Sequence, residues 1–115
     1  MKSQLSDEVR LKHILDSIKN INSFTKDFNE HLFLKNQMVQ SAVERQLEII
    51  GEAASKLTDE LKEKYPHIEW HKIKAFRNVI AHEYFGLSKI QTWTVVCVDL
   101  PLLKKNIRKI LKEIS

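Results

Sequence analysis

The sequence contains few of the residues that interrupt helices. Its 115 residues include only two glycines and two prolines, Pro66 and Pro101. Folds made of many short strands need frequent tight turns, and those turns are built mainly from these residue types. Their scarcity therefore favours long helices.

The sequence has only one cysteine, Cys97. One cysteine cannot form an internal disulfide or a multi-cysteine metal site. Its neighbours in "TVVCVDL" are mostly apolar, and a free cysteine among apolar residues usually behaves as a small hydrophobic side chain. We therefore expect Cys97 to be a buried structural thiol.

Long apolar runs are absent as well. No segment approaches the roughly 20 apolar residues needed to cross a bilayer, and the start "MKSQLSDEVR" lacks the apolar centre of a secretory signal. We expect a cytoplasmic protein without a membrane partner. The length suits one domain spanning residues 1–115, and 43% apolar with 30% charged residues is typical of soluble globular chains.

The charge of the chain is mildly positive, with a formal net value of +4. Clustered Lys and Arg attract polyanions such as nucleic acids. The densest basic group, "LKKNIRKILK", is nevertheless more typical of a solvated helix face. Charge alone therefore does not identify a binding site.

The spacing of apolar residues predicts two helices in the first half of the chain. Apolar side chains recur at three- and four-residue steps from Leu11 to Phe28, which predicts a helix over about 7–29 with Ser6 as its N-cap. A second such pattern predicts a helix through residues 40–57. Gly51 lies inside it, where glycine is unfavourable, so we expect another helix to approach closely there.

Two further helices are predicted after Pro66, which ends the second helix or a short extra helix behind it. The third begins near Trp70 and stops near Gly86. The fourth runs from about Lys89, capped by Ser88, to near the chain end, with a kink near Val98 ahead of Pro101. No strand-like alternation competes with these patterns. The expected fold is all-α, an antiparallel four-helix bundle.

The third predicted helix carries an unusual polar group in "FRNVIAHEYF". At 100° per residue, Arg77, Asn78, His82 and Tyr84 form one strip that faces away from the apolar stripe. Arginine binds phosphate with a planar pair of donors, and histidine exchanges protons near neutral pH. Together they could cleave an RNA phosphodiester without a metal.

One histidine cannot easily serve as both general base and general acid. A symmetric dimer that brings two strips together would supply two histidines and two arginines in one cleft, and would partly enclose charges that a monomer leaves in water. A simpler interpretation is also open. Arg77 and His82 could be surface residues paired with a carboxylate such as Glu83 or Glu44, with Tyr84 and Asn78 as helix-end residues.

The remaining candidates point to structural roles. His13, His31, His67 and His71 lack a metal-ligand spacing with Asp, Glu or Cys, so we expect surface residues and no metal or other cofactor. Both tryptophans, Trp70 and Trp93, are expected to pack in the core.

The sequence resembles the HepT-like toxins of the HEPN superfamily, whose signature is R-x-x-x-x-H-x-Y. Here that signature is complete, with Arg77, His82 and Tyr84 in the named positions. The similarity extends through "AVERQLEIIGEAASKL", "IEWHKIKAFRNVIAHEYFGL" and "WTVVCVDLPLLKKNI", in the family's order, and so covers nearly the whole chain.

The resemblance implies a HEPN-like homodimer with the signature residues of both subunits in a cleft. It implies a metal-independent endoribonuclease, the toxin of a type VII HEPN/MNT toxin–antitoxin system, with Arg77 and His82 as catalytic residues and Asn78 binding phosphate. The implied partner is a minimal nucleotidyltransferase (MNT) antitoxin that silences the toxin by AMPylation of Tyr84.

Two other functions stay open on the sequence alone. The chain could be a non-catalytic HEPN subunit that binds a nucleotidyltransferase or its substrate, because a fold does not fix a function. It could also be a structural dimer without a ligand, although the complete signature argues against this. Growth arrest that depends on His82 would separate the enzyme from both alternatives.

Overall fold

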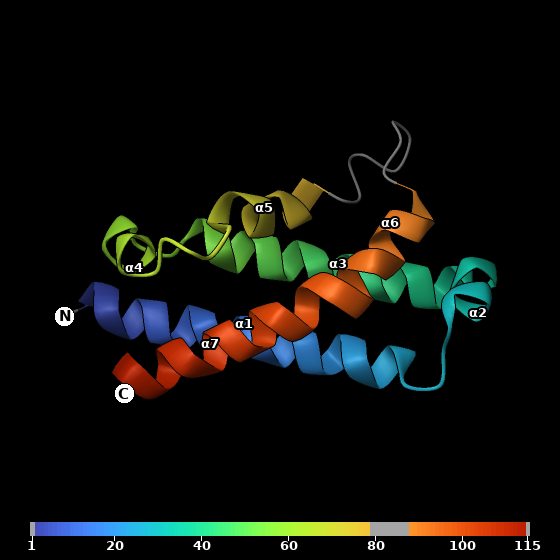
Figure 1. The fold of residues 1–115 in the computed structure, drawn as a ribbon, viewed down its shortest axis with the longest axis horizontal. Helices are drawn as coiled ribbons and strands as arrows, with labels where there is room; N and C mark the ends of the chain where they lie inside the picture. Colours follow the sequence, from blue (N-terminus) through green and yellow to red (C-terminus); the bar gives the residue numbers. More distant parts are fainter. Residues whose placement is uncertain (1, 79–87, 115) are drawn as a thin grey trace.

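The computed structural model describes residues 2–78 and 88–114, and within these ranges every regular element is a helix. Three long helices lie side by side: α1 (Lys2–Thr25), α3 (Gln37–Ser55) and α7 (Leu100–Ile114). Figure 1 shows that α3 and α7 both run opposite to α1. The predicted all-α class is confirmed.

The core is formed where the apolar stripes of these three helices meet. The period of three to four residues places one aliphatic side chain per turn on the inner face of each helix. Burying such a side chain stabilises the fold by about 1.5–3 kcal/mol relative to leaving it exposed. The fully buried aliphatic residues are Leu11, Ile14, Ile18 and Ile21 of α1, Val43, Leu47 and Ile50 of α3, and Leu100, Ile107 and Ile110 of α7.

The first helix differs at both ends from the prediction. It begins at Lys2, so Ser6 lies inside the helix and is not its N-cap. Asp7 is only 4% exposed, and its carboxylate accepts hydrogen bonds from Thr58 N (3.0 Å) and Thr58 Oγ1 (2.6 Å). Asp7 therefore attaches α1 to the segment after α3, a contact that local sequence cannot reveal.

A short helix that the periodicity did not indicate, α2 (Glu30–Lys35), follows α1. An asparagine caps the N-terminus of α2 and another caps that of α3. Asn29 Oδ1 accepts a hydrogen bond from Leu32 N, and Asn36 Oδ1 accepts one from Val39 N, each at 2.9 Å. A side-chain acceptor at this position satisfies a free N–H of the first helical turn. The predicted extension of the first helix to Asn29 is thus wrong, because Asn29 starts a new helix.

Of the two alternatives for the segment before Pro66, the short extra helix is the one present: it is α4 (Asp59–Lys64), with Thr58 as its N-cap. After Pro66 the chain forms α5 (Trp70–Ala75) and a single 3₁₀ turn, η1 (Phe76–Asn78). The predicted third helix is therefore described only as far as Asn78. Its remainder, including Gly86, lies outside the described residues.

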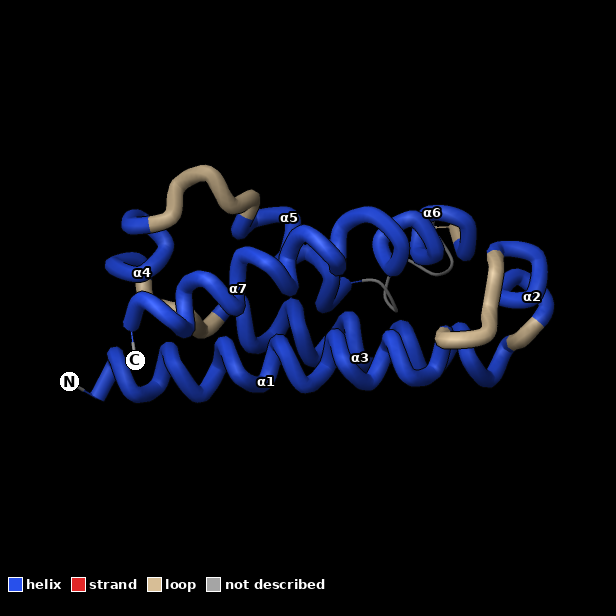
Figure 2. Tube along the Cα trace, turned by 60° about the horizontal axis from the view of Figure 1, so that its bottom comes forward, coloured by secondary structure: helices blue, strands red, loops and turns tan. Residues whose placement is uncertain are grey.

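The last part of the chain is helical from Lys89 onward, as predicted, but in three segments. Ser88 caps α6 (Lys89–Thr94) through a reciprocal pair of hydrogen bonds with Gln91. A π-helical turn, η2 (Val95–Asp99), then leads into α7. Figure 2 shows how α6 and α7 follow each other above α1 and α3.

The π turn accounts for one wrong prediction. Pro101 has no N–H to donate to the carbonyl four residues earlier, and Leu100 N donates to Val95 O, five residues earlier. The wider turn shifts the helix phase by one residue. Val96 is buried there, whereas Cys97 is exposed. Cys97 is therefore not the buried thiol that its apolar neighbours suggested.

Both tryptophans pack against the protein as expected. Trp70 is buried, and its indole Nε1 donates to Tyr65 O at 3.1 Å. Trp93 lies against Phe33, with ring centroids 5.0 Å apart, which joins α6 to α2. Among the described residues, no helix has the combination of length and hydrophobicity that a membrane crossing requires.

Candidate active site

The described part of the signature lies on η1, the turn that ends α5. Phe76 is buried, Arg77 is half-buried and Asn78 is exposed. The apolar residue thus anchors the turn in the core while the two polar residues reach the surface. Arg77 and Asn78 are the described part of the predicted polar strip, and both lie outside the core.

The backbone of Arg77 lies directly against Gly51 of α3. A Cβ atom added to Gly51 would lie 2.3 Å from Arg77 N and 2.9 Å from Arg77 Cα, which is far inside van der Waals contact. Only glycine allows this approach. The prediction that Gly51 marks a close approach is confirmed, and the approaching element is the one that carries Arg77.

The same face of α3 carries a second attachment. Glu44 lies seven residues before Gly51, which places the two on one side of the helix about 10 Å apart. The Glu44 carboxylate is buried and pairs with Lys89 Nζ at 2.6 Å. Arg77 and Lys89 come from opposite sides of positions 79–87 in the sequence. α3 therefore contacts the chain on both sides of positions 79–87, at Arg77 and at Lys89.

His82 and Tyr84 lie outside the described residues, as do Val79, Ile80 and Glu83 of the same segment. Arg77 and Asn78 are therefore the two predicted site residues for which the structure gives a position. Sequence adjacency alone links them to the other two.

The guanidinium of Arg77 is half-buried at the surface end of η1. Within residues 2–78 and 88–114, no carboxylate lies within ion-pair distance of its guanidinium. Glu44, one of the partners that a purely structural role would use, is engaged by Lys89. A half-buried guanidinium with a fixed backbone can hold a phosphate through two parallel hydrogen bonds.

A second contact fixes α5 relative to the last helix. Lys72 Nζ donates to Asp99 Oδ1 of η2 at 2.9 Å, and this hydrogen bond, together with the charge of Asp99, raises the pKa of Lys72. Between α5 and α7 lies a small cavity of about 60 Å³, to which Phe76 contributes. The turn carrying Arg77 thus rests on both α3 and the η2–α7 segment.

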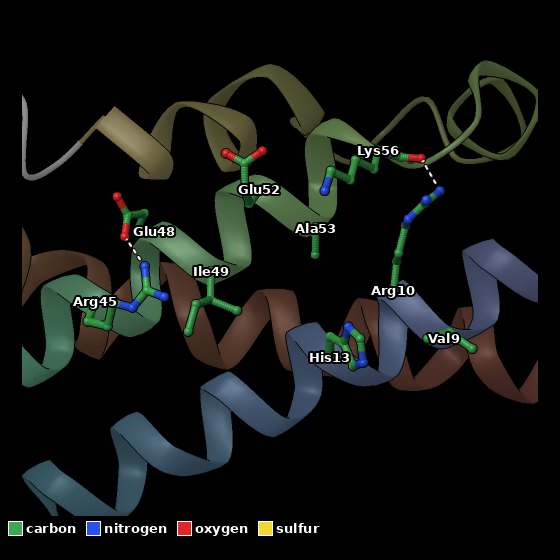
Figure 3. A pocket seen from close by; sticks show the side chains of 9 residues that line it. All are labelled: Val9, Arg10, His13, Arg45, Glu48, Ile49, Glu52, Ala53 and Lys56. Carbon is green, nitrogen blue, oxygen red and sulfur yellow. Dashed lines mark hydrogen bonds and ion pairs between the residues drawn. The ribbon is translucent and has the colours of Figure 1, made fainter.

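A wider hollow lies elsewhere, between α1 and α3 (Figure 3), with a volume of about 610 Å³. Three of its charged side chains, those of Arg10, Arg45 and Glu48, form contacts within the protein. Arg10 donates to the carbonyl of Lys56 at 2.6 Å and so caps the end of α3, and Arg45 pairs with Glu48. His13 lines it beside these groups. The sequence patterns did not indicate this hollow, because each contact joins residues that are far apart in sequence or look like ordinary surface charges.

The described part of the chain contains no group of three His, Cys, Asp or Glu side chains placed to hold a metal ion. The remaining histidines His31, His67 and His71 are exposed, as expected for surface residues.

Comparison with known proteins gives one consistent family. Residues 14–110, a range that includes the whole signature, match the family model described as "Ribonuclease HepT-like". A protein of Thermococcus cleftensis named "Probable ribonuclease HepT" is 35% identical over 102 residues, covering 89% of this chain and 93% of that protein. A "Putative RNase" of Methanocaldococcus jannaschii is 39% identical over 97 residues, covering 84% of this chain and 89% of that protein.

Another M. jannaschii protein, named "Gamma-glutamylcyclotransferase and putative RNase", is 43% identical over 108 residues. The match covers 94% of this chain but only 49% of that protein, so the chain spans about half of its length. No solved structure matches. The family match over residues 14–110, with a complete R-x-x-x-x-H-x-Y signature inside it, leads to one conclusion: the chain belongs to the HepT-like ribonuclease family.

Proposed function

We propose that this protein is a metal-independent endoribonuclease and the toxin of a type VII HEPN/MNT toxin–antitoxin pair. The observation that carries the proposal is the setting of Arg77: a half-buried guanidinium on a turn whose backbone contacts Gly51, without a carboxylate partner in the described residues. It stands at the first position of a complete family signature. An anion-binding arginine at that place fits phosphodiester cleavage.

The chemistry assigns a role to each signature residue. His82 removes the proton from a ribose 2′-hydroxyl, and the 2′-oxygen then forms a bond to phosphorus while the bond from phosphorus to the 5′-oxygen breaks. Arg77 stabilises the negative charge that builds on the phosphoryl oxygens. Asn78 is exposed beside Arg77 and positions the phosphate through its amide.

The proton for the leaving 5′-oxygen comes from a second histidine in this proposal. A two-fold dimer with both signature strips in one cleft supplies it as His82 of the other copy. The dimer also screens the two arginines from water, which strengthens their interaction with phosphate. Light scattering at micromolar concentration tests this step, and a strictly monomeric, RNA-cleaving protein would contradict it.

Regulation in this proposal acts on Tyr84. Its phenol oxygen attacks the α-phosphorus of ATP held by an MNT antitoxin, the bond to the β-phosphate bridging oxygen breaks, and pyrophosphate leaves. The adduct adds an anion beside Arg77 and His82 and competes with RNA for charge and space. A complete signature with tyrosine in its last position supports this assignment.

The decisive experiment is RNA cleavage by the purified protein in excess chelator, with His82→Ala and Arg77→Ala as variants. We expect cleavage by the wild type and a loss of about 10²-fold or more in each variant, since each removes a group that acts in the transition state. Arg77→Lys is the matched variant that keeps the charge but loses the paired donors. Equal cleavage by all four proteins, or strict dependence on a metal, would refute the proposed metal-independent enzyme that uses Arg77 and His82. No cleavage by the wild type would leave a non-catalytic binding subunit as the better assignment.

A further inference from the structure

The outer face of α7 is basic along most of its length. At 100° per residue, its five cations fall within an arc of about 140°, opposite the buried stripe of the helix. These cations are Lys104, Lys105, Arg108, Lys109 and Lys112. Three of them line a hollow between α7 and α1, which we call the basic groove.

The basic groove has a volume of about 390 Å³. Lys104, Lys105 and Arg108 line it from α7 together with Pro101, and Asn22 lines it from α1. Every side chain of this lining is neutral or positively charged. An amide beside three cations is the kind of surface that binds phosphate oxygens.

Among the described residues, the cations of the groove have no ion-pair partner. Within the described ranges, Lys104, Lys105 and Arg108 have no carboxylate at ion-pair distance. The one acidic residue of α7, Glu113, accepts a hydrogen bond from Tyr65 Oη at 2.6 Å, on the flank of α7 that faces away from the groove. The charges therefore remain available to a ligand.

Ordinary helix energetics do not explain this arrangement. Lys104 and Arg108 are four residues apart, and like charges at that spacing repel each other and destabilise a helix. Cations are favourable in the last turn because of the helix dipole, but α7 continues to Ile114, so both residues lie before that turn. A bound polyanion would turn the repulsion into attraction.

We propose that the basic groove binds the sugar–phosphate backbone of the RNA substrate at a distance from the scissile bond, as a second contact outside the signature strip. This rests on the proposed ribonuclease function. The occupant is RNA, because the proposed ribonuclease acts on this polyanion and the groove offers cations and an amide to its phosphates. No described aromatic side chain lines the groove, so the contact is with the backbone and not with stacked bases.

The position of α7 connects the groove to the candidate active site. One flank of the helix forms the groove with α1, and the other contributes Leu102, Leu103 and Asn106 to the small cavity beside Phe76. Phe76 precedes Arg77 directly. An RNA strand that runs from Arg77 to the groove therefore has to cross α7, a width of about 10 Å, over the exposed Lys105 and Lys109.

The test measures affinity separately from cleavage. The probe is a short single-stranded RNA in which every 2′-hydroxyl is methylated, so that it cannot be cut by attack of its own 2′-oxygen. Fluorescence anisotropy gives its Kd over a salt series for the wild type and for the triple variant Lys104→Gln, Lys105→Gln, Arg108→Gln. The matched control is Lys35→Gln, Lys62→Gln, Lys64→Gln, which lowers the formal net charge from +4 by the same three units at α2 and α4.

We expect the groove variant to bind roughly 10- to 100-fold more weakly near 0.1 M salt, and the slope of log Kd against log salt to fall by about 2, since each lost phosphate contact on a single strand contributes about 0.7. The control should change affinity only a few-fold. Equal weakening in both triple variants would show a net-charge effect and overturn the groove, as would unchanged affinity in the groove variant. If the groove variant lost binding to anionic lipid vesicles but kept its affinity for RNA, the surface would be assigned to a membrane. That result would also overturn the proposal.

The outcome is separable from that of the proposed function. Arg77→Ala is expected to cut ordinary RNA about 10²-fold or more slowly and to lower the salt slope of the methylated probe by only about 0.7, one phosphate contact. The groove variant is expected to raise KM with kcat largely kept. If Arg77→Ala cleaved normally, the catalytic assignment would fail, yet the affinity comparison of the two triple variants would still decide the groove. Circular dichroism melting of all variants shows that each is folded.

Discussion

Substituting Gly51 with alanine tests the link between α3 and the candidate active site. The new Cβ would lie 2.3 Å from Arg77 N and 2.9 Å from Arg77 Cα and Cβ. Two of these three atoms, N and Cα, belong to the backbone, so a side-chain rotation cannot relieve the contacts. Since ordinary contacts begin near 3.4 Å, η1 must move by about 1 Å.

Two opposing terms set the effect on stability. Alanine is favoured over glycine inside a helix by about 1 kcal/mol, whereas forcing an extra carbon into a packed site costs typically 1–3 kcal/mol. We expect Gly51→Ala to be destabilised by about 0–2 kcal/mol and to stay folded. A shift of 1 Å in a catalytic group can nevertheless cost roughly 10²-fold in rate. Activity should therefore fall far more than stability.

Single-turnover RNA cleavage and urea unfolding measure the two effects on the same protein. Ser41→Ala is the control, because it places the same residue at an exposed position of α3. Cleavage within about twofold of the wild type, combined with a gain of about 1 kcal/mol in unfolding free energy, would mean that helix propensity alone operates. That result would refute the close contact between Gly51 and Arg77.

Three further predictions address the attachments of the fold and the modification site. Asp7→Ala should lower the unfolding free energy by about 1–3 kcal/mol in chemical denaturation, because it leaves the Thr58 N–H without its acceptor in a partly buried place; unchanged stability would show that water replaces the carboxylate. Glu44→Gln removes the buried partner of Lys89 and should lower RNA cleavage more than it lowers the thermal midpoint, whereas a loss of stability alone would limit the pair to a folding role. Tyr84→Phe should fold, dimerise and keep part of its RNA cleavage, but gain no AMP from an MNT antitoxin with ATP and Mg²⁺; an AMP-sized increase in its intact mass would place the modification elsewhere.

Local sequence predicted those features that depend on nearby residues. The N-cap at Ser88 follows from a side chain that reaches three residues ahead to Gln91, and the close approach at Gly51 follows from a glycine where helices disfavour it. The polar character of Arg77 and Asn78 on an otherwise buried turn was visible from the helical spacing alone. The family signature then gave these residues a chemical role that spacing left open.

The features that were missed depend on contacts distant in sequence or on backbone irregularity. Asp7 was placed in the first turn of a helix, but its partner Thr58 is 51 residues away. Cys97 was expected in the core because its neighbours are apolar, and a π turn moved it to the surface. The predicted positions of His82 and Tyr84 lie outside the described residues, so their places beside Arg77 stay predictions.

The π turn has a consequence for how this chain can change over generations. A residue gained or lost in a regular helix turns everything beyond it by about 100° and would ruin the packing of one half. Val95–Asp99 already holds five residues in a turn of i to i+5 bonding, between α6 docked on Phe33 through Trp93 and α7 docked on α1. The rotation of α6 about its axis and that of α7 are therefore fixed by different contacts. Removal of one residue here could be absorbed by closing the π turn into an ordinary α turn, so that the buried stripe of α7 stays in the core and the attachment of Lys89 to Glu44 stays in place.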